Sequence, residues 1–195
     1  MMHSSRPTMH LMRLCALLGL LVLASAPANA EDGEWALSVG PSYRGISEAT
    51  GDDQTVLRSA PGVLVRARYG VGDFFQIGAS LDAGVALPTS HSPVAPVAAA
   101  LFEVHYVIDI VTWVPFVSAG VGALLRGGVP HEGITKDVDD AELRVDLAVT
   151  LGGGLEYRPA RDWAVGFAGR YELVVTDFER ADAFSLTLFY TTFFE

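Results

Sequence analysis

Charged residues that could do acid–base chemistry recur at every second position in two apolar segments of the sequence. They are Arg144, Asp146, Glu156, Arg158, Arg170 and Glu172. Carboxylates beside cations could serve as general acids and bases if a cleft exposed them to a substrate. The same residue types could instead neutralise one another as buried ion pairs. Which of these roles applies depends on the face of each segment that meets water.

The two segments are predicted to be the strands of one hairpin, Glu142 to Thr176, with its turn at Pro159–Asp162. Apolar residues alternate with polar ones along both halves, and a period of two indicates β-strands. In the first half, the odd-numbered positions from Leu143 to Tyr157 carry no charge. In the second half, the same holds from Trp163 to Val175. All the charges therefore fall on one face of the hairpin.

Six further segments alternate in the same way. They are Trp35–Arg44, Val63–Tyr69, Phe74–Val85, Ala98–Tyr106, Trp113–Leu125 and Phe184–Phe194. Three short turns, Gly70–Asp73, Asp109–Thr112 and Pro159–Asp162, alternate with four outer links, Gly45–Thr55, Pro88–Pro96, Gly127–Ala141 and Asp177–Asp182. Short turns at one end and longer links at the other are typical of a membrane-spanning barrel. The sequence therefore predicts an all-β fold, an eight-stranded antiparallel up-and-down transmembrane β-barrel. Pro41 and Pro115, which cannot donate to a ladder, are expected near strand ends.

The first 30 residues are predicted to be a signal peptide that is cleaved, which leaves 31–195 as the barrel domain. Arg6 and Arg13 precede an apolar run, Leu14–Ala24, and a small-x-small site ends at Ala30. The run holds Cys15, the only cysteine, so the mature chain can form no disulfide and no cysteine-ligated metal site. All 23 acidic residues follow the cleavage site, against all but two of the 13 basic ones. This acidic balance argues against nucleic acid as a partner.

A soluble sandwich or a lipocalin-type barrel would also alternate, with its apolar faces inside. Two features favour lipid on the apolar side. No Asp, Glu, Lys, Arg or His falls on the apolar faces of the eight segments. Each apolar face also has an aromatic residue near its short-turn end, as expected for a girdle at a membrane interface. These residues are Trp35, Tyr69, Phe75, Tyr106, Trp113, Tyr157, Trp163 and Phe194.

The polar faces then point into the lumen, where charges must be paired because an eight-stranded barrel is only just filled by its own side chains. The expected lumen charge network comprises Arg44, Arg66, Arg68, Asp82, Glu103, His105, Arg144, Asp146, Glu156, Arg158, Arg170 and Glu172. Depth from the girdle predicts pairing of Arg66 with Glu103 and of Asp82 with Arg170. His105 is expected to bond to a neighbouring acid. We expect this network to plug the lumen and leave no open pore.

Two stretches, Trp113–Leu125 and Gly152–Leu173, resemble the small outer-membrane β-barrel superfamily that includes the OmpA transmembrane domain, Opa- and Ail-like barrels and OmpW. The resemblance extends over Glu31–Glu195. It implies a Gram-negative outer membrane, termini in the periplasm, loops outside, and contact with lipid and lipopolysaccharide. It also implies recognition by the barrel-assembly machinery, which reads a terminal aromatic; here Phe194 is followed by Glu195.

The function expected from these features is a non-enzymatic structural or surface-interaction role, carried by the outer links and an unknown extracellular ligand. No catalytic residue, cofactor or metal is predicted. An OmpW-like narrow conduit for small apolar compounds is the alternative, and it needs an apolar upper lumen. A lipid A-modifying enzyme is less favoured, because the outward faces offer no Ser–His pair. Other weaker possibilities are an omptin-like site at His91, His131, Asp137 and Asp177, and a divalent-cation site at Glu132, Asp137, Asp139 and Asp140.

Overall fold

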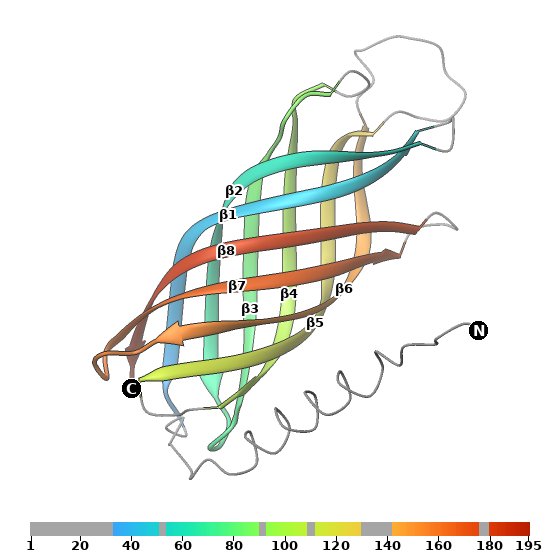
Figure 1. Cartoon of the computed structure of the whole chain (residues 1–195). Coiled ribbons are helices and arrows are strands. Elements are labelled where there is room, and N and C mark those ends of the chain that lie inside the picture. Colours follow the sequence, from blue (N-terminus) through green and yellow to red (C-terminus); the bar gives the residue numbers. More distant parts are fainter. Residues whose placement is uncertain (1–32, 51–53, 90–92, 109–111, 130–141, 176–179) are drawn as a thin grey trace, which may run out of the picture.

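The computed structural model describes residues 33–50, 54–89, 93–108, 112–129, 142–175 and 180–195. Within them the chain forms one closed barrel of eight antiparallel strands, each hydrogen-bonded to its neighbours in sequence, with the last strand pairing with the first (Figure 1). The strands are β1 (Trp35–Thr50), β2 (Gln54–Gly70), β3 (Phe75–Ala86), β4 (Ala95–Val107), β5 (Trp113–Val129), β6 (Glu142–Tyr157), β7 (Trp163–Val175) and β8 (Arg180–Phe194). The expected fold class is confirmed. The expected signal peptide lies outside the described residues.

The described residues include no helix with the length and apolar character needed to cross a membrane.

Closure of the barrel can be followed through its register. Stepping from each residue to its partner, the path that starts at Trp35 returns to β1 at Gly45, ten residues further along the strand. The path runs through Trp35, Tyr69, Ile77, Val104, Ala119, Leu151, Tyr171, Phe184 and Gly45. This stagger tilts the strands steeply against the barrel axis, as Figure 1 shows, and a barrel of this strand number holds side chains in its interior.

Alternation along the strands sorts the side chains as the sequence predicts. Along β3 and β4, buried positions alternate with exposed or half-buried ones almost throughout. Large apolar side chains such as Leu81, Phe102 and Leu188 are more than half exposed on the outer surface, whereas the charged residues face inward. An apolar exterior around a polar interior reverses the usual arrangement of a soluble barrel.

At the end with the outer links, five strands are three or more residues longer than expected: β1, β2, β4, β5 and β8. β1 and β2 continue their pairing to Thr50 and Gln54, so most of the expected link Gly45–Thr55 is a hairpin that projects beyond the barrel wall. β5 likewise runs to Val129, with a register shift after Arg126. The prediction ended these strands too early because polar residues and glycine break the apolar alternation there, although cross-strand pairing continues.

Pro41 does not lie near a strand end, contrary to expectation. It sits in the middle of β1, and the pairing of β1 with β8 is interrupted at Gly40 and Pro41 before it resumes in the same register at Ser42. Proline has no N–H to donate, which accounts for a break at this point. Pro115 does lie near the start of β5, as expected.

Glycines permit close approach of neighbouring strands. A Cβ on Gly122 would overlap the backbone carbonyl oxygen of Ala100 on β4, whereas a Cβ on Gly169 would make only an ordinary contact, 3.5 Å from Leu186 Cδ2. The β4–β5 pair therefore depends on glycine at position 122.

We predict that Gly122→Ala destabilises the folded barrel by about 1–3 kcal/mol, because the strand pair must move apart to admit the methyl group. Gly169→Ala serves as the matched control and should unfold at an unchanged urea concentration. Urea unfolding in lipid vesicles, followed by the loss of heat-modifiable gel migration, measures both variants. Equal midpoints for the two would contradict the steric argument.

Candidate functional site

The lumen holds an ionic network whose centre joins three arginines and three acids. We call this the central network: Arg44, Arg66, Asp82, Glu103, Arg170 and Glu172. Its members come from β1, β2, β3, β4 and β7, and alternation aims each of them inward. Since β7 borders neither β3 nor β4, the pairs it makes with them cross the lumen.

Arg170 is the hub of the central network. Its Nε and Nη1 donate to Glu172 Oε1 at 3.1 Å and to Glu103 Oε1 at 3.2 Å. Its Nη2 lies 3.6 Å from Asp82 Oδ2. One guanidinium thus interacts with three carboxylates, which a planar group with five N–H donors can do.

Arg44 and Arg66 make further contacts with the same three carboxylates. Arg44 Nη2 lies 3.0 Å from Asp82 Oδ2 and 3.3 Å from Glu172 Oε1, and Arg66 Nε lies 3.3 Å from Glu103 Oε2. Ser42 also donates to Asp82 Oδ1 at 2.7 Å. Both pairs expected from depth, Arg66 with Glu103 and Asp82 with Arg170, are present.

Smaller ionic groups lie above and below the central network. Towards the short turns, Arg68 Nη2 lies 2.6 Å from Glu156 Oε1, and its Nη1 donates to Gln76 at 3.1 Å. Towards the outer links, Asp146 accepts hydrogen bonds from both Arg126 and Arg144. The interior is therefore ionic at three levels.

Expected and observed members of the lumen network differ at four arginines. Arg58 and Arg126 are buried but were not predicted, because they lie where the alternation had seemed to end. Arg58 Nε donates to the Leu87 carbonyl at 3.2 Å and a second nitrogen to the Pro93 carbonyl. Arg144 and Arg158 were expected inside but lie at the two ends of the lumen, where both side chains are partly exposed.

Arg158 closes the short-turn end of the barrel. Its Nη2 lies 2.6 Å from Glu34 Oε1, and its guanidinium carbon lies 3.7 Å from the centroid of the Phe193 ring. The contact joins residues before β1, after β6 and at the end of β8. The inward-facing Phe193 thus packs under a cation, whereas Phe194 points outward.

His105 does not bond to an acid, which corrects the expectation. Its Nε2 is 3.9 Å from Glu103 Oε2, beyond hydrogen-bond range. The imidazole instead packs on the Phe116 ring, with centroids 5.7 Å apart, in a buried apolar cluster that also contains Phe189. Depth alone could not reveal that an aromatic ring lies beside His105.

An apolar layer separates the central network from the arginines near the outer links. It consists of Ile46, Ala60, Ala86, Val97, Ala99, Leu101, Leu124, Ala148, Val174 and Ala183. None of these residues is more than 4% exposed. Small residues dominate this layer, and they are closely packed.

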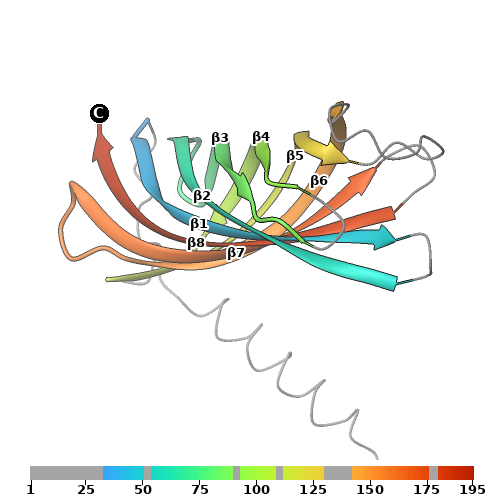
Figure 2. The ribbon, with the colours of Figure 1, turned by 90° about the horizontal axis from the view of Figure 1, so that it is seen from above.

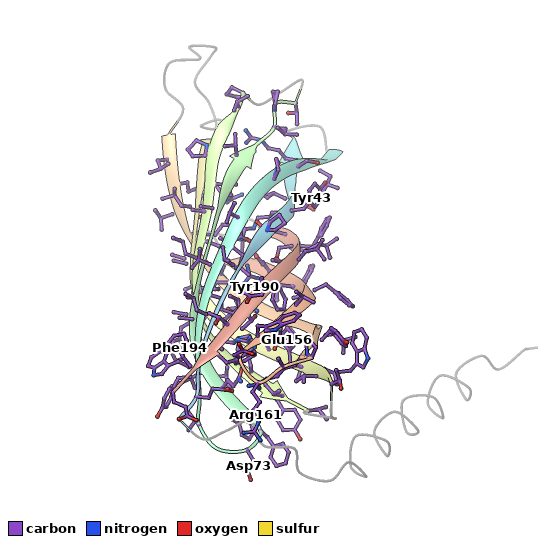
Figure 3. All side chains as sticks on the ribbon, turned by 90° about the vertical axis from the view of Figure 1, so that its left-hand side faces the viewer. Tyr43, Asp73, Glu156, Arg161, Tyr190 and Phe194 are labelled. Atoms are coloured by element: carbon purple, nitrogen blue, oxygen red, sulfur yellow. The ribbon has the colours of Figure 1, made fainter. Side chains whose placement is uncertain are left out.

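The eight expected girdle aromatics lie on the outer surface near the short turns. Neighbouring strands bring them together in pairs, with ring centroids 5.0 Å apart for Trp35 and Tyr69 and 4.8 Å apart for Trp113 and Tyr157. Phe75 and Tyr106 pair at 5.4 Å. Trp163 stacks on Tyr190, at 6.1 Å, which adds a ring that the sequence reasoning did not include. In Figure 3, Tyr43 lies towards the end opposite Asp73 and Arg161, and Tyr190 lies between these ends.

The described residues hold no group of three or more His, Cys, Asp and Glu side chains that could bind a metal ion. The weaker candidates from the sequence, His91, His131, Asp137, Asp177 and the acids Glu132, Asp139 and Asp140, lie outside the residues that the structure describes.

A closed antiparallel barrel with an apolar exterior, aromatic pairs at one level and an ionic interior is the architecture of a bacterial outer-membrane protein. The chain matches the family described as "Outer membrane protein beta-barrel domain" over residues 14–191, and it belongs to that family. It is accordingly a protein of the outer membrane.

Solved structures of other small barrels share the fold. Ail of Yersinia pestis, crystallised with the heparin analogue sucrose octasulfate, is 14% identical with a TM-score of 0.58, covering 84% of this chain and 100% of Ail. Neisserial surface protein A is 10% identical with a TM-score of 0.61, over 83% of this chain and 97% of that protein. OprG of Pseudomonas aeruginosa is 9% identical with a TM-score of 0.60, over 86% and 98%. Among curated protein sequences, none matches this chain.

We predict that Arg170→Gln destabilises the barrel by about 3–5 kcal/mol, because three buried carboxylates lose a shared cation. The control is Arg144→Gln, whose side chain is 36% exposed at the end of the lumen and whose loss should cost at most about 1 kcal/mol. The shift in urea midpoint, converted with the slope of the unfolding transition, gives both values. Similar shifts in the two variants would show that the central network contributes no more than a surface pair.

Proposed function

We propose that this protein is a non-enzymatic outer-membrane barrel whose lumen is plugged by salt bridges and whose outer links interact with the cell's surroundings. The observation that supports this most is the central network, which crosses the lumen and leaves its carboxylates and guanidiniums buried. A conducting pore would need these charges to face a continuous water column. Their mutual pairing serves the structure and leaves no acid or base poised for a substrate.

The aromatic pairs would place the barrel in the bilayer. Their rings lie at one level near the short turns, where interfacial Trp and Tyr are expected in transmembrane barrels. In this orientation the short turns face the periplasm and the outer links face outward. Lipopolysaccharide would then surround the outer half, and the barrel-assembly machinery would insert the chain through β8.

The composition of the outer links indicates what kind of surface they would meet. The four links contain ten acidic residues against two basic ones, Lys136 and Arg180. A polyanion such as the heparin analogue bound by Ail would be repelled. We therefore propose a cationic partner, or one held through bridging divalent cations.

The apolar layer favours a second function, an OmpW-like conduit for small apolar compounds, since such a route needs an apolar upper lumen. Ten inward residues form this layer, but their side chains are closed to solvent. A conduit would have to open against this packing, and we rank it second for that reason.

We predict no stable open-channel current from the purified barrel in planar bilayers, because the central network blocks the passage of ions. Heat-modifiable migration of the same sample establishes that the inserted protein is folded. Reproducible single-channel steps from folded protein would contradict the plugged lumen. Accelerated entry of an apolar probe into vesicles, without ionic current, would instead support the conduit.

Immobilised heparin should not retain the detergent-solubilised barrel at about 0.15 M salt, where charges are screened beyond about 8 Å but local repulsion persists. If heparin did retain the barrel and high salt released it, the acidic links would not determine the partner.

A further inference from the structure

The outer surface of the barrel carries a groove of about 630 Å³, which is unexpected on a convex wall. It crosses β5, β6, β7, β8 and β1, in the half of the wall nearer the short turns. Its lining is Val39, Gly40, Pro41, Trp113, Leu155, Tyr157, Val165, Gly166, Phe167, Leu188, Phe189 and Tyr190. Every side chain in it is apolar or aromatic, and the polar atoms on offer are the phenol hydroxyls and the indole N–H.

Two internal rings and the glycines that face them explain the depression. A Cβ on Gly166 would lie 2.7 Å from Phe189 Cζ, and one on Gly154 would lie 2.6 Å from Phe116 Cζ. The strand backbones therefore rest directly on these rings, closer than any residue with a Cβ would allow. On the β1 side, Gly40 approaches the Leu188 carbonyl oxygen, and the ladder is interrupted at Gly40 and Pro41. β7, β8 and β1 lie side by side along this face of the barrel (Figure 2).

The groove begins at the aromatic girdle and rises to mid-membrane. Its lower end is the Trp113–Tyr157 pair, and its upper end is Pro41, six residues along β1 from the girdle residue Trp35. At about 3.3 Å per residue and a tilt of about 45°, six residues rise about 14 Å along the membrane normal. That is about half of a hydrocarbon core of about 30 Å, the depth of one leaflet.

The end of the groove at the short turns also offers groups for a headgroup. The turn between β6 and β7 carries Arg161, which is exposed and follows Tyr157 by four residues (Figure 3). A guanidinium suits a phosphate. An indole N–H and a phenol hydroxyl at the same level suit the ester region of a lipid.

We propose that the groove is a binding site for one phospholipid of the periplasmic leaflet, with an acyl chain along Tyr157, Leu155 and Val165 towards Val39 and a phosphate near Arg161. The surface is continuous with the lipid-facing band of the barrel, so lipid is the medium that meets it. The depth of one leaflet and the exposed guanidinium of Arg161 distinguish this site from the rest of the band. The proposal does not depend on what the outer links bind or on whether the lumen conducts.

Filling the groove tests the site. Val39→Phe combined with Val165→Phe adds bulk to its wall, and the control is Val104→Phe with Val121→Phe on β4 and β5, away from the groove. The pairs are matched in exposure, at 42% for Val165 and Val104 and 47% for Val39 and Val121. Both double variants are reconstituted with phosphatidylglycerol, extracted gently, and checked for folding by heat-modifiable migration. Native mass spectrometry then counts the phospholipids that each retains.

We expect one phosphatidylglycerol on wild type and on the control, and a loss of at least tenfold in the retained fraction for the groove-filled variant. In vesicles with bromine on the acyl chain, and with Trp35→Phe and Trp163→Phe in both variants so that Trp113 is the one tryptophan, fluorescence should be quenched more strongly in the control than in the groove-filled variant. Equal retention in the two variants, or none in wild type, would overturn the proposal. A dimer lost only on filling the groove would also overturn it, since the occupant would then be a second copy.

Discussion

The requirement that charge inside a closed barrel be neutralised within the lumen governs this structure. Eight strands leave an interior with room for side chains and little else. Lipid outside the wall offers a guanidinium no alternative to an interior partner. Among the described residues, six arginines and six acids are buried, and each charged group lies in contact with an opposite charge or with a backbone carbonyl. The interior thus meets its desolvation cost by pairing, as any buried ion must.

The ion pairs that cross the lumen can form only when the barrel is closed. Arg170 on β7 contacts Glu103 on β4 and Asp82 on β3, and neither strand is its neighbour. Hydrogen bonds between adjacent strands could form in an open sheet, but these contacts need the opposite wall. If the register of any of these strands shifted by one residue, its charged side chain would face the lipid instead of the lumen. The central network therefore disfavours wrong registers, in addition to any stability it contributes.

The alternation of apolar and polar residues along the sequence was enough to predict the barrel, its faces, its short turns and two of the lumen pairs. Strand ends near the outer links were missed, because pairing there continues through residues such as Gly45 and Ser59 that carry no apolar signal. Arg58 and Arg126 were missed with them. Alternation gives the face and depth of a residue but not the size of its neighbours, which is why the Phe116 ring beside His105 could not be foreseen.

Glycine connects the inside of the barrel to its outer shape. Charged side chains in the lumen are accommodated where neighbouring inward positions lack a Cβ: one on Gly78 would lie 3.0 Å from Arg68 Cγ, and one on Gly120 would lie 3.0 Å from Glu103 Cγ. Nearer the short turns the lumen also holds Phe116 and Phe189, and glycines on the neighbouring strands let the backbone approach their rings. Where a glycine faces a ring, the backbone of the wall lies closer to that ring than a residue with a Cβ would allow. The contour of the groove thus depends on inward-facing residues as well as on lipid-facing ones, and a change at an interior glycine would alter the outer surface as directly as a change on the lipid-facing side.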